Sequence, residues 1–467
     1  MTDLRSFLHE HAAAVWSLPK PVSVRHSLTA LQHRLDRSGH FPVLLARKVV
    51  LPDGQLSDIP VVTNLTASRE LTAQALGVTN HRDMAAWFAA RSASAIAPQV
   101  LSRDRAPVQS RVFQGDEADL TRLPALIQHC GEPGPYLTAA HATTYDPDTG
   151  VDNTAIQRCW IKGPRIMSWW PYPATHNARN LRKFTARGEA CPVVFWIGHH
   201  PRVLIGTQAK LSYPQSHWQA AGGVLGSALR VVPSISHGER IMVPADAEIV
   251  IEGRTLPGQL APDGPFGEYT GYMGPAVDAP LVEVSCITMR DEAIYHDYGS
   301  GLTDMLVPDN MAMEGKLFGM IKAVAPSLRN VYVPASTRRF VAIVQLAEPL
   351  AGEARDALVA ALAYRRVKAV IVVDADVDIF DKHAVDWAVA TRTQWRRDTV
   401  VVDGLSGSSL DPSLPEGEGT TSKIGIDATR SGRNKGKPVP VLAVPDTADL
   451  EAADLLAGAN VQNWPIA

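Results

Sequence analysis

The sequence is poor in cysteine and carries little net charge. Its four cysteines lie far apart in a chain of 467 residues, a spacing that fits neither a disulfide framework nor a paired-cysteine metal motif. We therefore expect buried, reduced thiols. The net charge is only −3, with acidic and basic residues interspersed, which argues against a nucleic-acid partner and against an anionic membrane surface. The cysteines are Cys130, Cys159, Cys191 and Cys286.

Long apolar runs are also missing. No stretch approaches the length that a membrane-spanning helix needs, so no membrane association is expected. The first ten residues contain neither the basic segment nor the apolar segment of a secretory signal. Together with the reduced thiols, this predicts a cytoplasmic protein.

The composition is that of an ordinary globular protein, with 45% apolar and 20% charged residues. The length suits two or three domains, each with its own core. The pattern of the first hundred residues predicts a small α/β unit, followed by a linker over residues 97–108. The expected strands are 43–50 and 60–65, and the expected helices are 70–76 and 84–93.

From about residue 110 to residue 300 the pattern is mostly β. A turn-rich segment, 146–150, separates two strand-like runs as in a hairpin. The predicted strands are 136–145, 153–161, 191–198, 247–252 and 281–289, and the predicted helices are 176–186 and 216–221.

After about residue 310 helices and strands alternate, which predicts an α/β layer with a mainly parallel or mixed sheet. Beyond residue 405 we expect mostly loop, until a helix at 449–457 that would dock on a partner subunit. The predicted helices of this region are 310–324, 353–364 and 383–391, and the predicted strands are 340–346, 368–374 and 399–402.

One short segment uses many positions to shape the backbone: Asp263-Gly-Pro-Phe-Gly-Glu-Tyr-Thr-Gly-Tyr272. Glycine permits conformations that a side chain would block, and proline fixes φ. This frame suggests that Asp263 and Glu268 are aimed at a ligand. The aromatic residues Phe266, Tyr269 and Tyr272 would desolvate a carboxyl group and raise its pKa. A pair of exposed loop acids is the alternative, and the motif alone weighs the two about evenly.

The second segment is Asn153-Thr-Ala-Ile-Gln-Arg158. Its Arg158 lies toward the end of a predicted strand, among apolar and aromatic neighbours. A guanidinium brought close to the two acids would complete a site suited to proton transfer. Taken alone, Arg158 could equally cover apolar surface with its stem, and Asn153 could be a turn residue.

Two histidines lie at the starts of predicted helices, His176 in one and His217 in the other. Together with Asn153 they could supply one oxygen and two nitrogens to a metal ion, although an ordinary position near a helix start explains each histidine as well. The nearby run Gly222-Gly-Val-Leu-Gly226 lacks a preceding strand, so we reject a dinucleotide-binding fingerprint.

Taken in order, these segments resemble the UbiD family of reversible decarboxylases, which use prenylated flavin mononucleotide (prenylated FMN). The resemblance runs from about residue 40 to residue 430, and the combination of motifs is far more specific than any one of them. It implies an N-terminal α/β domain (1–105), a central split β-barrel domain that binds flavin (106–305) and a C-terminal α/β domain with a dimerisation tail (306–467). The segments are Asn153…Arg158, Ala220-Ala-Gly-Gly-Val-Leu-Gly226, Ala247-Glu-Ile-Val-Ile-Glu-Gly253, Asp263–Tyr272 and Ser422-Lys-Ile-Gly-Ile-Asp-Ala-Thr429.

The resemblance implies a catalytic network of Arg158, Asp263 and Glu268, with Asp263 at a position often held by glutamate. The substrate would add covalently to the prenylated flavin, Arg158 would orient its carboxylate, and Glu268 would protonate the carbon that loses CO₂. The residues implied to hold the flavin are Asn153, Thr154, Ile156, Gln157, Arg158, Trp169, Thr175, His176 and His217.

The resemblance also implies ions at the flavin phosphate. Asn153 and His176 would bind a divalent ion, typically Mn²⁺, and K⁺ is a further candidate. The family's third metal ligand is a glutamate, whereas this chain has His217, which removes one negative charge. His217 would either coordinate the ion with the other two residues or pair with the phosphate as a cation. We expect weak or absent divalent metal, because Mn²⁺ prefers hard oxygen ligands.

The resemblance implies a small aromatic, heteroaromatic or α,β-unsaturated carboxylic acid as the substrate. A pocket formed by Leu302, Met305 and Ile426 would be largely apolar, which suits a flat ring without selecting one. A flavin prenyltransferase would supply the cofactor, and the protein would be a homodimer or a higher homo-oligomer. Two other functions compete with this one. The first is a metal-dependent hydrolase with Asp263 and Glu268 as its acid–base pair, and the second is a flavin-binding protein without chemistry of its own.

Overall fold

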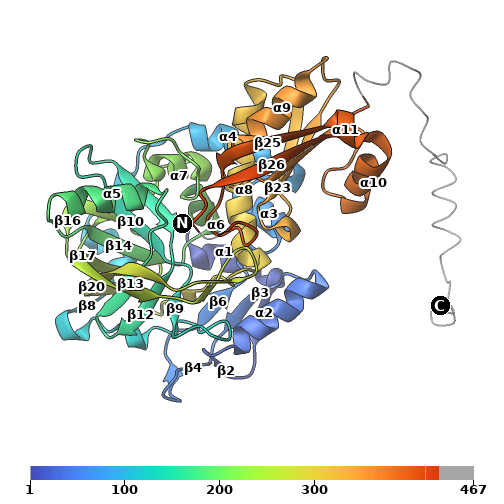
Figure 1. Cartoon of the computed structure of the whole chain (residues 1–467). Coiled ribbons are helices and arrows are strands. Elements are labelled where there is room, and N and C mark those ends of the chain that lie inside the picture. Colours follow the sequence, from blue (N-terminus) through green and yellow to red (C-terminus); the bar gives the residue numbers. More distant parts are fainter. Residues whose placement is uncertain (1, 416, 431–467) are drawn as a thin grey trace, which may run out of the picture.

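The computed structural model describes residues 2–415 and 417–430. Three groups of elements follow one another along the chain, and Figure 1 shows them in blue, in green to yellow, and in orange to red. The central group forms a nine-stranded sheet and the C-terminal group a five-stranded sheet. Helix α8 (Thr303–Lys322) connects the two groups and packs against α4 and β22. The predicted mixed α/β class is confirmed.

The N-terminal group shares its sheets with the central group. Strand β3 pairs in parallel with β1 and antiparallel with β6, and β21, from much later in the chain, extends this sheet beside β6. Strand β7, inside the predicted linker, pairs with β15. The elements are α1 (Leu4–Glu10), α2 (Ser27–Ser38), α3 (Arg69–Leu76), α4 (Met84–Ala93), β1 (Val15–Leu18), β2 (Val22–Ser23), β3 (Val43–Ala46), β4 (Val49–Val50), β5 (Leu56–Ser57), β6 (Val61–Thr63) and β7 (Gln99–Val100).

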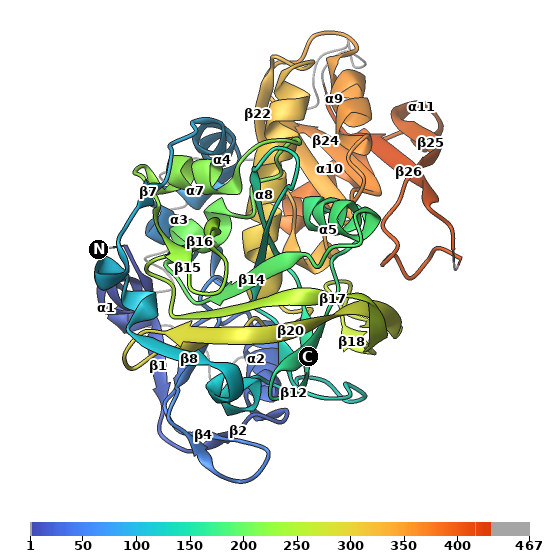
Figure 2. The same ribbon diagram turned by 90° about the vertical axis from the view of Figure 1, so that its left-hand side faces the viewer.

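The central sheet is built around two long antiparallel strands, β17 and β20, which Figure 2 shows lying side by side. The predicted hairpin is confirmed as β10 and β11. The strands of the nine-stranded sheet are β8 (Arg111–Gln114), β9 (Tyr136–Leu137), β10 (His141–Tyr145), β11 (Asp152–Ile156), β12 (Cys159–Gly163), β13 (Ile166–Trp169), β14 (Pro192–Ile197), β17 (Ile249–Asp263) and β20 (Val277–Met289). The other strands of the central group are β15 (Arg230–Ser234), β16 (Gly238–Pro244), β18 (Phe266–Gly267), β19 (Met273–Gly274) and β21 (Tyr295–His296). The helices are α5 (His176–Ala186), α6 (Pro201–Gly206) and α7 (His217–Leu225).

Strand β14 shows that the central sheet is covered by a hydrophobic core on each of its two faces. Val193, Phe195 and Ile197 pack into one core, while Val194 and Trp196 pack into a second core on the opposite side. Successive side chains of a strand point to opposite faces, so an unbroken apolar run is buried on both.

The C-terminal sheet has the strand order β22-β23-β24-β26-β25 and mixes parallel with antiparallel pairs, as predicted. Its elements are β22 (Leu328–Tyr332), β23 (Val341–Leu346), α9 (Glu353–Leu362), β24 (Ala369–Asp374), α10 (Lys382–Arg392), α11 (Trp395–Asp398), β25 (Thr399–Ser406) and β26 (Thr420–Asp427). The predicted helix at 449–457 lies outside the described residues.

Strand β26 contradicts the prediction of loop beyond residue 405. Its buried positions include Thr421, Lys423 and Gly425, so the strand lacks the apolar alternation by which a half-buried strand is recognised. Burial of a lysine requires partners, and Nζ of Lys423 donates to the backbone oxygens of Leu362, at 3.0 Å, and Tyr364, at 2.9 Å.

Helix α8 begins at Thr303, before the predicted start at residue 310. The difference arises at Pro308, which lacks an N–H group and normally interrupts a helix. Here the carbonyl oxygen of Asp304, which Pro308 cannot bind, accepts a hydrogen bond from the hydroxyl of Thr66 at 3.0 Å. The expectation for the cysteines was also wrong at one position, because Cys130 is exposed, whereas the other three are buried.

Helix α7 is fixed at both ends. The carboxylate of Asp152 accepts hydrogen bonds from the backbone N–H groups of His217 and Trp218, at 2.7 and 3.0 Å. Further along, a Cβ atom on Gly223 would lie 2.3 Å from the carbonyl oxygen of Arg91. The absence of a side chain at Gly223 therefore lets α7 approach α4 closely. The contacts with Asp152 and with α4 together fix the position of α7 and of His217 at its start.

We predict opposite effects for two glycine substitutions in helices. Gly223→Ala should lower the free energy of unfolding by about 1–3 kcal/mol, because the added methyl group collides with backbone. The matched control Gly319→Ala in α8, where a Cβ would meet nothing within 4 Å, should raise it by up to about 1 kcal/mol through helix propensity. Denaturant unfolding of both variants measures the difference, and equal effects would contradict the packing account of Gly223.

Candidate active site

Three charged side chains from three separate segments meet in the central domain. Arg158 lies in the break between β11 and β12, Asp263 ends β17, and Glu268 follows β18. Nε of Arg158 donates a hydrogen bond to Oδ1 of Asp263 at 2.7 Å, and Nη1 donates to Oε1 of Glu268. The structure thus brings together the three side chains that were expected to form a catalytic network.

The guanidinium of Arg158 is held in one orientation. Asp263 is fully buried, and its second oxygen accepts a hydrogen bond from the hydroxyl of Ser168 at 2.6 Å. The guanidinium carbon also lies 4.6 Å from the ring centroid of Trp170 and 4.9 Å from that of Phe266. Two carboxylates and two aromatic faces therefore define its position.

Glu268 differs from Asp263 in its surroundings and in its readiness to hold a proton. Its side chain is 12% exposed. Burial raises the pKa of Glu268, the neighbouring Asp263 carboxylate adds to this effect, and Arg158 opposes it. Glu268 is therefore the member of the cluster suited to gain and lose a proton.

The glycines near Glu268 serve the shape of this segment. Gly264 has a φ of +107°, and a Cβ there would lie 2.9 Å from the carbonyl oxygen of Pro275. A Cβ on Gly274 would lie 2.9 Å from Cγ of Glu268. The expected aromatic enclosure is wrong in part, because Tyr272 is 64% exposed and so contributes no desolvation.

Arg158 and Glu268 line a cavity of about 150 Å³, which we call the inner cavity. Its wall includes four aromatic side chains, and it also receives arginines from the C-terminal domain. The lining residues that bear on the chemistry are Arg158, Trp170, Tyr172, Phe266, Glu268, Tyr269, Ser300, Met305, Arg339, Arg365 and Arg366.

A second cavity, of about 420 Å³, shares part of this wall, and we call it the basic cavity. Its cationic side chains come from four regions of the chain, whereas Asp309 is its one acidic lining residue among those described. Asp309 is already paired with Lys210, with Arg339 at 3.1 Å and with Arg366 at 2.6 Å. The five cations are Lys210, Lys316, Arg339, Arg365 and Arg366.

Asn153, His176 and His217 all line the basic cavity. The two imidazole rings are 6.3 Å apart, centroid to centroid. Nδ2 of Asn153 donates to Oδ1 of Asn177 at 2.6 Å, which leaves its oxygen for another partner. Burial, together with His176 and Lys210, lowers the pKa of His217 to about 3, so this structure favours a neutral ring over the cationic alternative.

The remaining predicted residues fall into two sets. Thr154, Ile156, Gln157 and Thr175 line the basic cavity. Trp169 is buried behind it and donates a hydrogen bond from Nε1 to Oε1 of Gln157 at 3.0 Å, which makes it a support for Gln157.

The three predicted pocket residues are also separated. Met305 lines the inner cavity, and Leu302 lines a further cavity on the other side of Glu268. Ile426 lies in β26, where it pairs with Ile371 of β24 and Thr399 of β25, and it is absent from the described lining of the inner cavity.

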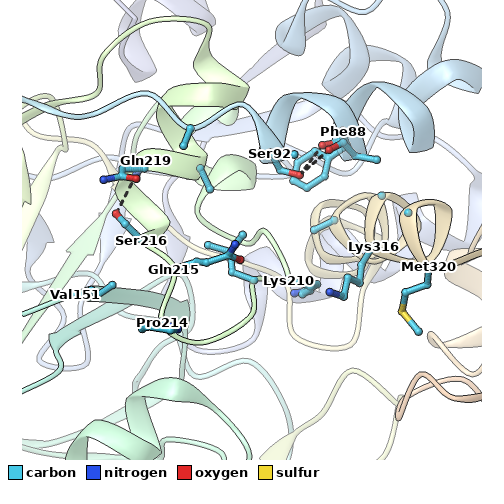
Figure 3. A pocket seen from close by; sticks show the side chains of 18 residues that line it. Phe88, Ser92, Val151, Lys210, Pro214, Gln215, Ser216, Gln219, Lys316 and Met320 are labelled. Carbon is cyan, nitrogen blue, oxygen red and sulfur yellow. Dashed lines mark hydrogen bonds between the residues drawn. The ribbon is translucent and has the colours of Figure 1, made fainter. Parts of the chain in front are cut away.

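A larger groove of about 600 Å³ lies between α4, α7 and α8 (Figure 3). It adjoins the basic cavity at Lys210 and Lys316. Its described lining contains no carboxyl group or imidazole. We therefore place the candidate active site at the inner cavity rather than in this groove.

Comparison with known proteins identifies the family. Residues 17–90, 99–302 and 310–428 match, in turn, the N-terminal, Rift-related and C-terminal domains of the 3-octaprenyl-4-hydroxybenzoate carboxy-lyase family, UbiD. The chain belongs to the UbiD family.

Individual UbiD proteins resemble the whole chain. It is 30% identical over 384 residues to the anhydromevalonate phosphate decarboxylase of Methanothermobacter thermautotrophicus, covering 82% of this chain and 88% of that protein. The UbiD-class enzyme HmfF of Pelotomaculum thermopropionicum, solved in complex with FMN, is 33% identical with a TM-score of 0.89, over 97% of this chain and 99% of HmfF. The 3,4-dihydroxybenzoic acid decarboxylase of Enterobacter cloacae, solved without ligand, is 25% identical with a TM-score of 0.86, over 97% and 99% of the two chains.

The protein is therefore a UbiD-family decarboxylase, a carboxy-lyase, as the motifs predicted. The hydrolase and the non-catalytic alternatives are set aside. Among the described residues, no helix is long and apolar enough to cross a membrane. In the same part of the chain, no group of three or more histidine, cysteine, aspartate or glutamate side chains is placed to hold a metal ion.

Sequence reasoning missed several residues of this UbiD site. Trp170 and Ser168 fix the Arg158–Asp263 pair. Neither residue belongs to a sequence motif that would have indicated this role. The cations of the basic cavity carried a weak signal, because two of its three arginines are adjacent in the sequence, as Arg365-Arg366. Adjacent arginines that enter one cavity from the C-terminal domain can be recognised only once the domains are packed together.

We predict that Asp263→Asn lowers the pKa of Glu268, because the substitution removes a like charge that favours the protonated form. Infrared titration of the carboxylic acid C=O band, assigned by its loss in Glu268→Gln, measures this pKa. The control Ser168→Ala removes a hydroxyl donor but keeps the Asp263 charge, so it should leave the Glu268 titration nearly in place. An unchanged titration in Asp263→Asn would contradict the coupling of the two acids.

Proposed function

We propose that this enzyme catalyses the reversible, non-oxidative decarboxylation of a small aromatic, heteroaromatic or α,β-unsaturated carboxylic acid, with prenylated FMN as its cofactor. The observation that carries the proposal is the buried Arg158–Asp263–Glu268 cluster in a cavity that adjoins a second, cation-lined cavity. An acid that holds a proton beside a fixed cation is what a carboxylate substrate needs on losing CO₂.

The basic cavity suits the phosphate and ring of a flavin nucleotide. Its volume lies in the range of cofactor pockets, about 300–1,000 Å³. Lys316 and Arg365 line it without a carboxylate partner among the described residues, so their charges are available to a phosphate. HmfF has been solved with FMN, and an evolved dimeric form of HmfF with prenylated FMN. Thr154, Ile156, Gln157 and Thr175 would contact the flavin from the opposite wall.

When bound, prenylated FMN supplies the electron sink that no amino-acid side chain provides. Arg158 would bind the substrate carboxylate and orient the C–C bond that breaks. Asp263 would keep the guanidinium in place through its hydrogen bond with Nε of Arg158. Glu268 would deliver its proton to the carbon that loses CO₂, and in the carboxylation direction it would remove a proton from that carbon.

The inner cavity limits the size of the substrate. A cavity of about 150 Å³ is known to accept a benzene ring, and this one has the same volume. Trp170, Tyr172 and Phe266 offer aromatic faces to such a ring. We therefore favour a one-ring acid or a short unsaturated acid over a polycyclic acid.

The wider organisation of the enzyme is proposed on the same grounds. The three domains would be residues 1–105, 106–305 and 306–467, and the enzyme would work as a homodimer or a higher homo-oligomer in the cytoplasm. A flavin prenyltransferase would supply the cofactor.

Asn153, His176 and His217 would be the ligands of a divalent ion at the flavin phosphate. This donor set contains no carboxylate, and Asp309 is engaged by its three cationic partners. We propose that manganese binding is weak, because two neutral nitrogens and one amide oxygen suit Mn²⁺ poorly.

We predict that His217→Glu increases manganese retention. Elemental analysis of flavin-loaded protein after chelation should find well under one manganese per flavin in the unmodified enzyme and a ratio close to one in the variant, since a carboxylate adds a hard, charged ligand. His40→Glu places the same change at an exposed position and should leave the ratio unchanged. One tightly held manganese per flavin in the unmodified enzyme would show that the proposal of weak binding is wrong.

We predict that Glu268→Gln lowers decarboxylation at least about a hundredfold while the flavin remains bound, because glutamine keeps the shape of the side chain but cannot transfer a proton. CO₂ release from one-ring acids measures the activity, and the flavin absorbance measures cofactor content. The matched variant Glu239→Gln, at an exposed position of β16, should behave like the unmodified enzyme. Turnover of Glu268→Gln within a few-fold of normal would remove Glu268 from its role.

A further inference from the structure

Glu268 lies in the wall between two cavities. On one side it faces the inner cavity, and on the other it faces a cavity of about 420 Å³, which we call the histidine cavity. The histidine cavity reaches the surface, because Tyr272 and Met273 on its rim are 64% and 42% exposed and Cys130 is also exposed. Glu268 therefore has one face toward the chemistry and one toward solvent.

Two imidazoles line the histidine cavity and contact each other. Nε2 of His33, from α2, lies 3.4 Å from Nε2 of His129. Nδ1 of His129 is 2.9 Å from Oε1 of Glu132, whose side chain is fully buried. A carboxylate can only accept here, so this contact places a proton on Nδ1 of His129 and fixes the tautomer of the ring. His129 is therefore oriented by Glu132 and connected through His33 to the half-buried surface of α2.

His129 also packs directly beside the segment that carries Glu268. A Cβ atom on Gly267 would lie 2.5 Å from Nδ1 of His129, and the N–H of Gly267 donates to Oε1 of Glu132 at 3.4 Å. The absence of a side chain at Gly267 thus allows the imidazole to reach the residue next to Glu268.

Ser300 marks the boundary between the two cavities. It lines both of them, it is 1% exposed, and its hydroxyl has no hydrogen-bond partner among the described residues. Its backbone N–H donates to Oε1 of Gln128 at 2.8 Å, next to His129 in the chain. A buried hydroxyl of this kind is normally satisfied by ordered water, so it supports a hydrated connection at the level of Glu268.

During catalysis the inner cavity would be occupied by the substrate that Glu268 protonates. Its other walls include aromatic rings and arginines that would hold substrate and cofactor. The proposed reaction consumes one proton per turnover: Glu268 gives its proton to carbon and becomes a carboxylate, and a new proton must reach it before the next cycle. With the inner cavity filled, the histidine cavity still gives Glu268 a side that reaches the surface.

We propose, on the basis of the proposed function, that His129 returns the proton to Glu268 between turnovers through water in the histidine cavity, and that His33 supplies His129 from solvent. The imidazolium of His129 loses a proton, Glu268 gains it, and the neutral imidazole is then protonated by way of His33. His129 acts through Glu268 and is a relay residue. The other charged or titratable groups that line the cavity are Asp36, Arg37, Cys130, Tyr272 and Arg338, and Glu132 contacts His129 from behind the lining.

The test separates the first turnover from later ones. Rapid-quench measurements on the full-length, prenylated-FMN-loaded enzyme would follow CO₂ release from whichever of benzoate, 3,4-dihydroxybenzoate, vanillate and cinnamate the unmodified enzyme converts fastest. In His129→Gln, which can still donate to Glu132, the first turnover should stay within about twofold of normal, because Glu268 has time to gain its proton before the substrate is added. Later turnovers should slow about tenfold or more, as expected for loss of a proton-transfer group.

Two further measurements exclude a merely structural role. Free imidazole should restore later turnovers several-fold in His129→Ala, which leaves room for the ring, and should not accelerate the control His40→Gln, a change at an exposed histidine. Equal slowing of first and later turnovers, absence of imidazole rescue, or normal later turnovers in His129→Gln would each overturn the relay. Failure of the unmodified enzyme to release CO₂ from every acid of the panel and from 2-furoate and pyrrole-2-carboxylate would instead overturn the proposed function on which the relay rests.

Discussion

The contact between the Arg158 guanidinium and the buried carboxylate of Asp263 is the interaction on which the rest of the site depends. Removing one partner of a buried ion pair leaves an uncompensated charge and costs about 3–5 kcal/mol. The pair is therefore strongly fixed, and Ser168 and Trp170 restrict it further. Because Asp263 neutralises the guanidinium, Glu268 is free to exist as an acid, and its burial favours that form. Arg158 thus forms a fixed ion pair with Asp263, and Glu268 on its other side is the acid suited to transfer a proton.

Charge is distributed unequally between the cavities, and this distribution separates their tasks. The basic cavity concentrates cations around Asp309, the one acid of its described lining, which suits a phosphate group that stays bound. The inner cavity places its acid, Glu268, opposite aromatic faces, which suits a substrate that must enter and leave. The arginines shared by both come from the C-terminal domain, so the site is complete only where that domain meets the central sheet (Figure 2).

Local patterns in the sequence were sufficient for elements whose signals are local. Helix α5 was predicted with its observed ends, His176 and Ala186, because Gly188 stops an amphipathic run. The carboxylate pair was recognisable from its glycine and proline frame. Strand β26 was not, since its buried face is polar and is satisfied by distant carbonyl groups. The partners of Arg158 and the cations of the basic cavity arise from packing of remote segments, for which no spacing rule exists.

The central claim is that this chain decarboxylates its substrate only with a prenylated flavin in the basic cavity. The most direct measurement compares enzyme expressed with and without a flavin prenyltransferase, assaying CO₂ release from one-ring acids and exchange of the product's ring hydrogen with D₂O. The account predicts folded protein from both preparations, with turnover and exchange only after co-expression, because plain FMN lacks the electrophilic site. Equal activity from the two preparations would contradict it.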